Sequence, residues 1–230
     1  MSVYVMSDIH GDYDRYIKML EKINFSNEDK LFILGDVIDR GKHSIKILQD
    51  MMLRPNIFPI LGNHEYMAIN SLKFLCQEVT DDTINQFSPD LMRGILQWQA
   101  VGGSETIDEF RKLSQEEKED VFDYLYEFSL YEEIKVNGTH YILVHAGLND
   151  FDIDKPLSSY SLRDMIFDRL DYSKVYFPDK ILITGHTPTR YINGEDKIYK
   201  ANNHIAIDCG CGYGFVLSCL CLNTMEEFYV

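Results

Sequence analysis

Short apolar segments alternate along the chain with longer stretches in which apolar residues follow the helical repeat. Five of these segments are typical of buried strands, because they are brief and almost entirely apolar. They lie at Val3–Met6, Lys30–Leu34, Ile57–Leu61, His140–Val144 and Lys180–Thr184. The alternation of such strands with helical patterns predicts an α/β fold.

The segment between the first two strands has the pattern of an amphipathic helix. Its apolar residues, from Tyr13 to Ile23, recur near the helical repeat, and Asp12 stands in a position suited to an N-cap. We therefore expect a β-α-β unit in this part. Three later segments show no helical pattern and are separated by Gly-rich or polar turns, which predicts an antiparallel finish and hence a mixed sheet. They cover residues 204–209, 214–222 and 226–230.

The stretch from Glu65 to about Leu130 contains helical patterns alone. One helix is marked by a capping box, in which Ser114 and Glu117 precede an apolar repeat. No Pro- or Gly-rich linker sets this stretch apart, so we expect a helical insertion over about residues 66–130 that packs on the core. Residues 1–230 would then form one catalytic domain with a mixed sheet flanked by helices.

Composition and charge narrow the classes of partner. The chain of 230 residues is 45% apolar, which is enough to bury a full core. Its 37 acidic and 22 basic residues give a formal net charge of −15, and such a surface repels polyanions. This disfavours duplex nucleic acid as a partner. Neither a membrane-spanning run nor a signal peptide is recognisable, so we expect a cytoplasmic protein with no membrane partner.

Four of the five cysteines form two C-x-C pairs late in the sequence, a spacing that also occurs in zinc knuckles. The flanking segments are apolar, however, and a free cysteine in a strand behaves as a small hydrophobic residue. A cytosolic setting also disfavours disulfides. We therefore expect reduced core cysteines, with a metal knuckle as the alternative, at Cys209, Cys211, Cys219 and Cys221.

Side chains able to bind metal or phosphate follow each of the five predicted strands directly. Because strand ends are where open α/β sheets place their sites, we expect these side chains on one rim. In Asp8-Ile9-His10, alternate residues of an extended strand end would point the same way and chelate one ion together. A carboxylate such as Asp36 can bridge two ions. The candidate ligands, whose oxygen and imidazole donors suit manganese, iron, zinc or cobalt, are Asp8, His10, Asp36, Asn63, His145 and His186.

Each motif also has an ordinary structural explanation when it is taken singly. Asp8 or Asp12 could cap the helix that follows, and Gly35-Asp36 could form a turn. An isolated histidine is more often structural than a ligand. Five ordered motifs after five predicted strands are hard to obtain by chance, and this joint occurrence favours a metal site.

The same motifs, in this order, resemble the signature of the calcineurin-like metallophosphoesterases, and among them the phosphoprotein-phosphatase branch. The resemblance runs from about residue 3 to about residue 215, and the segment Trp98–Thr106 is similar to one in small bacterial and phage members. It implies a metallophosphoesterase-like sandwich of mixed sheet flanked by helices. The motifs that carry it are Asp8-x-His10, Gly35-Asp36-x-x-Asp39-Arg40-Gly41, Gly62-Asn63-His64-Glu65, His145-Ala146-Gly147 and Gly185-His186.

The resemblance implies two bound transition-metal ions, with manganese favoured and iron or zinc as alternatives. A hydroxide between the two ions would be the nucleophile. By the family's pattern, the first ion would be held by Asp8, His10 and Asp36, and the second by Asp36, Asn63, His145 and His186.

Catalytic roles beside the metals are implied in the same way. His64 would protonate the leaving group, and Asp39 would orient its ring. Arg40 and a second arginine would grip the phosphoryl oxygens through forked guanidinium donors. Arg169 is the favoured second arginine, and Arg163 is the alternative.

The branch that the chain resembles implies a phosphatase acting on phosphorylated Ser, Thr or Tyr in proteins. Hydrolysis of a dinucleoside polyphosphate or another small phosphoester is the alternative, and a binding module that has lost catalysis is a third hypothesis. Leu61 stands where eukaryotic members have an arginine, which puts the transfer of their protein-substrate preferences in doubt. The sequence leaves the oligomeric state open.

Overall fold

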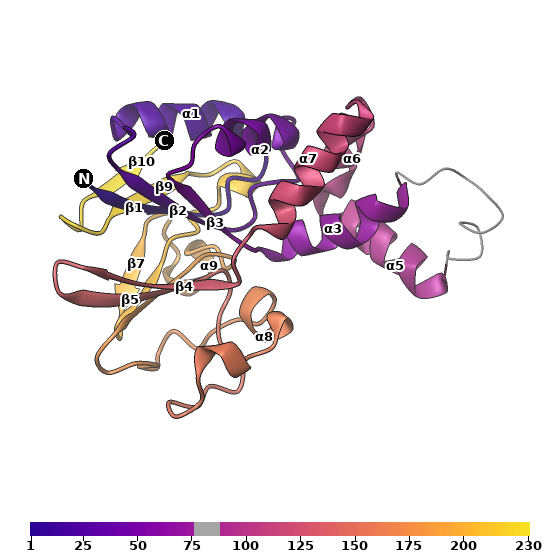
Figure 1. Ribbon diagram of the computed structural model, residues 1–230. Coiled ribbons are helices and arrows are strands. Elements are labelled where there is room, and N and C mark those ends of the chain that lie inside the picture. Colours follow the sequence, from indigo (N-terminus) through magenta and orange to yellow (C-terminus); the bar gives the residue numbers. More distant parts are fainter. Residues whose placement is uncertain (76–87) are drawn as a thin grey trace.

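Two five-stranded sheets form the centre of the computed structural model, which describes residues 1–75 and 88–230 (Figure 1). The strand order is β10-β9-β1-β2-β3 in the first sheet and β4-β5-β6-β8-β7 in the second. The first sheet consists of β1 (Val3–Met6), β2 (Lys30–Leu34), β3 (Ile57–Ile60), β9 (Ser218–Cys221) and β10 (Glu227–Tyr229). The second consists of β4 (Tyr131–Val136), β5 (Thr139–Val144), β6 (Ile181–Thr184), β7 (Tyr199–Ala201) and β8 (His204–Ala206).

All five predicted strands are present, as β1, β2, β3, β5 and β6, and the predicted mixed α/β fold is confirmed. In the first sheet β1, β2 and β3 run parallel, while β9 and β10 are antiparallel to their neighbours. In the second sheet β5, β6 and β8 run parallel. The carboxyl ends of three strands therefore meet along one edge of each sheet.

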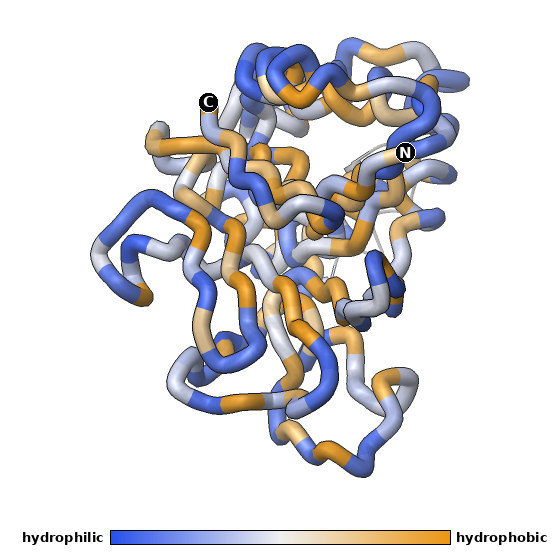
Figure 2. Tube along the Cα trace, turned by 90° about the vertical axis from the view of Figure 1, so that its left-hand side faces the viewer, coloured by the Kyte–Doolittle hydropathy of each residue, from blue (hydrophilic) through white to orange (hydrophobic). Residues whose placement is uncertain are grey.

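Three apolar clusters explain the order of the layers. The inner faces of the sheets pack on each other through residues such as Val5, Leu34, Leu143 and Ile183. The outer face of the first sheet is covered by α1 (Tyr13–Lys22) and α2 (Ser44–Met52), and α8 (Leu162–Ile166) packs on the outer face of the second. Figure 2 shows several apolar segments passing through the middle of the trace.

The helical insertion extends away from the two sheets in Figure 1. Its buried side chains, such as Leu72, Trp98 and Leu125, belong to the same apolar cluster as α1, α2 and the first sheet, so the insertion shares their core. The predicted capping box at Ser114 and Glu117 is confirmed at the start of its last helix. Its elements are α3 (Asn63–Leu75), α5 (Pro89–Trp98), a π-helical turn (Gln99–Gly103), α6 (Ser104–Phe110) and α7 (Gln115–Tyr126).

One local prediction was wrong, and one strand was not predicted. Of the three late segments expected to form an antiparallel finish, the first is β8, which lies in the other sheet and runs parallel to β6. Strand β4 was not predicted, although Asn137 and Gly138 both have positive φ and join it to β5 in the manner of a tight hairpin. The predicted N-cap at Asp12 is confirmed, since its side chain accepts a hydrogen bond from the backbone of Arg15.

Within residues 1–75 and 88–230, none of the helices combines the length and the apolar character needed to cross a bilayer.

Candidate metal centre

The loops after the parallel strands bring the candidate ligands to one rim and join the two sheets there. Backbone N–H of His186, after β6, donates to Asp8 Oδ2, after β1, at 2.9 Å. The Nδ1 atom of His145, after β5, lies 2.6 Å from the carbonyl oxygen of Leu34 at the end of β2. The rim therefore gathers side chains that are far apart in the sequence.

Backbone conformation at the ligands is unusual. Asp8, His10, Asp36 and His186 have φ values of 53°, 50°, 52° and 62°, a left-handed region that non-glycine residues rarely occupy. The expectation of an extended Asp8-Ile9-His10 segment was therefore wrong, although Ile9, between the two ligands, is fully buried. Such conformations persist where the surroundings enforce them. Here the N–H groups of Asp8 and His10 donate to the carbonyls of Gly35 and Asp36, which fixes the first loop to the second.

Glu65 fastens two of these loops, a role that the sequence analysis did not assign. Its fully buried carboxylate accepts four backbone N–H groups at 2.8 to 3.2 Å. Burial and the charge of Asp36 raise the pKa of Glu65 to about 7, while the backbone donors pull it in the opposite direction. The donors belong to Asp36, Val37, Ile38 and Gly62.

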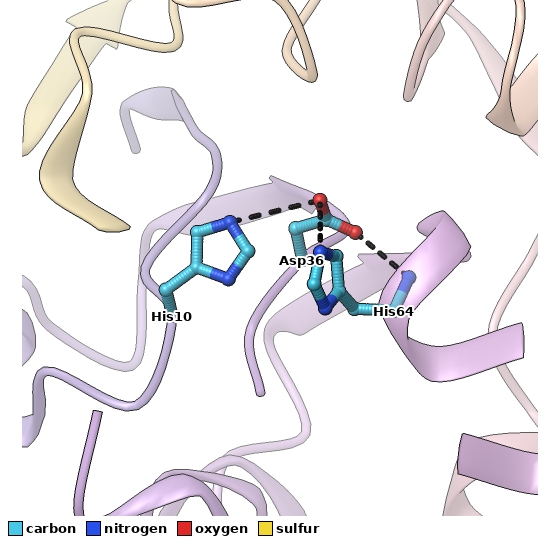
Figure 3. A group of neighbouring side chains, drawn as sticks. All are labelled: His10, Asp36 and His64. Atoms are coloured by element: carbon cyan, nitrogen blue, oxygen red, sulfur yellow. Dashed lines mark hydrogen bonds and ion pairs between the residues drawn. The ribbon is translucent and has the colours of Figure 1, made fainter. Parts of the chain in front are cut away.

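The first group of potential ligands lies around one oxygen of Asp36 (Figure 3). His10 Nε2 is 3.7 Å and His64 Nε2 is 3.8 Å from Asp36 Oδ2, and His10 Nε2 is 4.0 Å from Asp8 Oδ1. His10 Nδ1 lies 3.0 Å from the carbonyl of Ile38, which directs the other ring nitrogen toward the aspartates. His64, which the sequence analysis did not count as a ligand, is thus close enough to belong to this group.

The second group lies around the other oxygen of the same carboxylate. His145 Nε2 is 3.4 Å from Asp36 Oδ1 and 3.0 Å from Asn63 Oδ1, and the rings of His145 and His186 have centroids 5.0 Å apart. Ligand atoms of Asp36, His145 and His186 lie within 4.8 Å of one another. The two oxygens of Asp36 therefore face two different clusters, as a carboxylate shared by two cations does.

The protonation states favour metal binding by these imidazoles. Burial lowers the pKa of His10 and His145 below the ordinary value, and burial together with His145 lowers that of His186 to about 3. All three rings are therefore neutral near pH 7, and neutral imidazole is the form that binds metal.

Asp208 is a buried carboxylate of the rim that the sequence analysis did not single out. Burial raises the pKa of Asp208 to about 7. The pKa of Asp8 is also raised, mainly by burial and then by the negative charges of Asp208 and Asp36. Such a cluster of buried carboxylates is costly unless positive charge compensates it, so the donor set fits divalent cations. The signal was available in the sequence, because Asp208 follows an apolar segment just as Asp8 and Asp36 do.

His64 lies between Asp36 and a buried hydrogen-bond network. Its Nδ1 is 2.6 Å from Asp39 Oδ2, and its Nε2 is 3.3 Å from Arg40 Nη2. Burial opposes protonation of His64, but the charges of Asp36 and Asp39 outweigh it and raise the pKa. The Arg40 guanidinium stacks on Tyr213 at 4.5 Å and so remains beside the site.

The two candidates for a second arginine differ in position. Arg169 is exposed and lines a hollow of about 420 Å³ with Asn149 and Lys174, and its charge contributes to lowering the pKa of His186. Arg163 instead lies over the ring of Phe167, with 5.6 Å between the guanidinium carbon and the ring centroid, and lines a separate hollow with Tyr66. The charge of Arg169 thus acts on one candidate ligand, and its contact with a phosphoryl group stays a prediction.

The late cysteines take no part in the clusters found among the described residues. All four are free and buried, as expected for core residues. Burial raises the thiol pKa of Cys209 and Cys211 to about 12, so they are protonated rather than thiolate ligands. The prediction that these four cysteines are core residues is confirmed.

A groove of about 320 Å³ adjoins His10 on the outer side of the site. Its lining includes Tyr13, Arg40, Lys42 and His43. Asp12 and Asp14 also contribute, but Asp12 is paired with Arg15 at 3.6 Å. On a protein with a net charge of −15, the groove therefore offers two cationic side chains next to the metal ligands.

Two bacterial proteins named as bis(5'-nucleosyl)-tetraphosphatases are similar in sequence to this chain. A symmetrical bis(5'-nucleosyl)-tetraphosphatase of Wigglesworthia glossinidia brevipalpis is 48% identical over 67 residues, which cover 28% of this chain and 25% of that protein. An asymmetrical bis(5'-nucleosyl)-tetraphosphatase, PrpE, of Oceanobacillus iheyensis is 27% identical over 242 aligned positions, covering 93% and 86% of the two chains. The chain spans only about a quarter to two fifths of the length of the first curated relatives it matches.

Solved structures and a family model agree on the fold. The crystal structure of a putative diadenosine tetraphosphatase superposes with a TM-score of 0.68 at 18% identity, covering 100% of this chain and 92% of that one. The model of the calcineurin-like phosphoesterase family matches residues 1–213. That range contains every loop of the rim described above. The chain therefore belongs to the calcineurin-like phosphoesterases, as its motifs indicated.

Proposed function

We propose that this protein is a two-metal phosphoesterase that hydrolyses dinucleoside polyphosphates. The observation that carries the proposed chemistry is the position of Asp36. Its Oδ1 lies 3.4 Å from His145 Nε2 and its Oδ2 lies 3.7 Å from His10 Nε2, so one carboxylate is shared by two groups of ligands. Two cations held there would supply the charge that activates water and stabilises the oxygens of an in-line displacement.

The side chains of the rim divide the remaining work. Asp8 and His10 complete one ligand group, and Asn63, His145 and His186 complete the other. His64 donates a proton to the leaving oxygen from Nε2, since Asp39 occupies its Nδ1. Arg40 and Arg169 bind the phosphoryl oxygens, because guanidinium groups suit bidentate contacts with phosphate.

The substrate class is supported by the relatives and by the groove. The curated relatives described above are named for hydrolysis of dinucleoside tetraphosphates, and one of them aligns over most of both chains. A polyphosphate chain extends beyond the reacting phosphorus, and the groove beside His10 presents Arg40 and Lys42 to such an extension. Phosphates bound there would add affinity that a simple monoester lacks.

A phosphoprotein phosphatase, the function implied by the motif resemblance, is the second candidate. The His64–Asp39 pair favours it, because the alkoxide of Ser or Thr needs a proton on departure. A departing nucleoside phosphate needs that proton far less. The two candidate reactions therefore differ in how strongly their rates depend on the His64–Asp39 pair.

The experiment is a substrate panel with added Mn²⁺, followed by metal analysis of the purified protein. We expect turnover of diadenosine tetraphosphate, and turnover of Ser, Thr or Tyr phosphopeptides alone would overturn the proposed substrate. Asp36→Asn removes the shared carboxylate and should abolish turnover, whereas Asp123→Asn, on an exposed face of α7, should leave it unchanged. A fully active Asp36→Asn protein would contradict the two-metal chemistry.

A further inference from the structure

We propose that Trp98 and Thr106, both from the helical insertion, are positioning residues that hold Asp39 and thereby orient His64 for proton transfer. The inference rests on the two-metal phosphoester hydrolysis proposed above, with either substrate class, since it concerns the proton donor of the same site. It assigns the insertion a part in the chemistry in addition to its part in the core.

The carboxylate of Asp39 is fully buried and has three short hydrogen bonds. Its Oδ2 lies 2.6 Å from His64 Nδ1 and accepts the indole N–H of Trp98 at 2.6 Å. Its Oδ1 accepts the hydroxyl of Thr106 at 2.6 Å. Because the two oxygens are held by different donors, the carboxylate cannot turn about its Cβ–Cγ bond without breaking at least one of these bonds. The direction from Asp39 to the imidazole is therefore fixed.

The turn between α5 and α6 explains why both donors reach the same carboxylate. Trp98 is the last residue of α5 and Thr106 lies in α6, and the π-helical turn between them contains a kink at Gly102, whose φ is 115°. The indole packs directly on Gly103, where a Cβ atom would lie 2.6 Å from the ring. Trp98 and Thr106 are 0% and 1% exposed, so water does not substitute for them.

The same turn also holds the neighbouring arginine. The backbone N–H of Arg40 donates to the carbonyl of Gly102 at 2.9 Å, and Arg40 Nε donates to the carbonyl of Val101 at 3.4 Å. Asp39 and Arg40 both have positive φ, 74° and 65°, and the contacts from the insertion keep this loop in its uncommon conformation. Asp39, which orients the proton donor, and the phosphate-binding Arg40 are thus both held by the segment 98–106.

The hydrogen bonds from Trp98 and Thr106 stabilise the buried Asp39 carboxylate and fix its orientation. A buried carboxylate without hydrogen bonds is costly, and a freely turning one would leave the imidazole in several orientations. General acid catalysis needs the proton within hydrogen-bond reach of the leaving oxygen, so misorientation lowers the rate where that proton matters. Substrates whose leaving group departs readily without a proton should lose little.

The experiment compares kcat on phenyl phosphate, a poor leaving group, with kcat on p-nitrophenyl phosphate, an activated one. In Trp98→Phe and Thr106→Val we expect kcat for phenyl phosphate to fall roughly tenfold, as is common when an outer hydrogen-bond partner is removed, with a much smaller fall for the activated ester. Thr106→Ser keeps the hydroxyl and should restore the wild-type ratio. Ile107→Val, a buried neighbour of Thr106 on α6, is the matched control and should not change the ratio.

A second measurement covers the case in which aryl phosphates are not turned over. Trp98 is the only tryptophan of the chain, so its indole N–H gives a single nitrogen-15 correlation peak in the Zn²⁺-loaded protein. We expect a downfield proton shift that exchanges slowly and moves in Thr106→Val, because the second oxygen of Asp39 has then lost its donor. It should not move in Ile107→Val.

The outcomes separate this inference from the proposed function. If His64→Asn alters the leaving-group ratio but Trp98→Phe and Thr106→Val lower both rates equally, the two residues are only structural and the inference is wrong. A freely exchanging indole proton would contradict it as well. If the wild-type protein hydrolyses no phosphoester, or if Asp36→Asn is fully active, the proposed function fails while the indole peak still reports on the hydrogen bond.

Discussion

Glu65 and Asp39 are both fully buried carboxylates beside the rim, yet their partners are of different kinds. Glu65 accepts four backbone N–H groups from the loops after β2 and β3. Asp39 accepts side-chain donors from His64, Trp98 and Thr106, in addition to the groups that its own backbone binds. Most substitutions leave a backbone N–H donor in place, and only proline removes it, whereas side-chain donors can be exchanged one at a time. Glu65 therefore shapes the rim itself, and Asp39 connects the rim to the helical insertion.

The largest effect should come from Glu65→Gln, which tests the backbone side of this comparison. Glutamine has one acceptor oxygen, so about half of the four N–H groups would lose their partner. We expect the free energy of unfolding to fall by roughly 2–6 kcal/mol, at about 1–3 kcal/mol for each unpaired group, together with a loss of activity. Urea unfolding followed by circular dichroism in the presence of a chelator measures this.

The control for Glu65→Gln is Glu116→Gln, at an exposed position of α7, where unfolding should change by less than about 0.5 kcal/mol. Equal stability of the two variants would show that Glu65 does not fasten the loops.

The next effect tests whether Asp39 and His64 act as one unit. His64→Asn should slow substrates with poor leaving groups roughly 10²-fold or more, which is the usual contribution of a general acid. Asp39→Asn should give a similar loss. The double variant should then be no slower than His64→Asn alone, because residues that act together lose their contribution once. Multiplying losses, measured as kcat on phenyl phosphate, would contradict a shared role.

A smaller effect is expected from Gly102→Ala, which changes the insertion where its backbone contacts Arg40. Gly102 has φ of 115°, and an added Cβ would lie 2.6 Å from Arg40 Cγ. We expect stability to fall by about 1–2 kcal/mol from backbone strain and KM to rise as Arg40 is displaced. Gly194→Ala is the matched control, because its φ is 84° but nothing lies within 4 Å of an added Cβ. It should lose stability without any change in KM.

The smallest effect should come from Lys42→Ala in the groove, which touches neither buried carboxylate. We expect kcat/KM for diadenosine tetraphosphate to fall about threefold to tenfold, with the difference shrinking as salt screens the charge. Turnover of p-nitrophenyl phosphate should not change, since it has no second phosphate. Lys112→Ala, an exposed lysine of the insertion, serves as the control. Equal losses on both substrates would argue against a polyphosphate in the groove.

Much of the rim could be predicted because its signals are local. Each parallel strand is an apolar run, and the residues directly after it lie at the carboxyl edge of a sheet whatever the rest of the chain does. Asp8, Asp36 and His145 followed from this rule alone. The backbone conformation did not, since the left-handed φ of Asp8 and His10 depends on hydrogen bonds to a loop that comes 25 or more residues later.

The partners of the buried carboxylates could not be predicted for a similar reason. Trp98 is 59 residues from Asp39 in the sequence, and Thr106 is 67 residues away. An apolar helical pattern does not show whether a tryptophan only packs in the core or also donates a hydrogen bond from its indole N–H. Glu65 and Asp208 were within reach of the strand-end rule but were not assigned roles. The division into two sheets depends on which strands pair, a long-range choice that short apolar segments do not specify.

The first sheet has its earliest strand at the centre and its latest strands beside it. β1 pairs with β9, and the backbone of Val3 donates to the side chain of Asn223 at 2.7 Å. During synthesis on the ribosome, β1 can pair with β2 early but must wait for residues 218–229 before its other edge is covered. A nascent chain stalled before that point would expose an open strand edge, and chaperones or aggregation would compete for it.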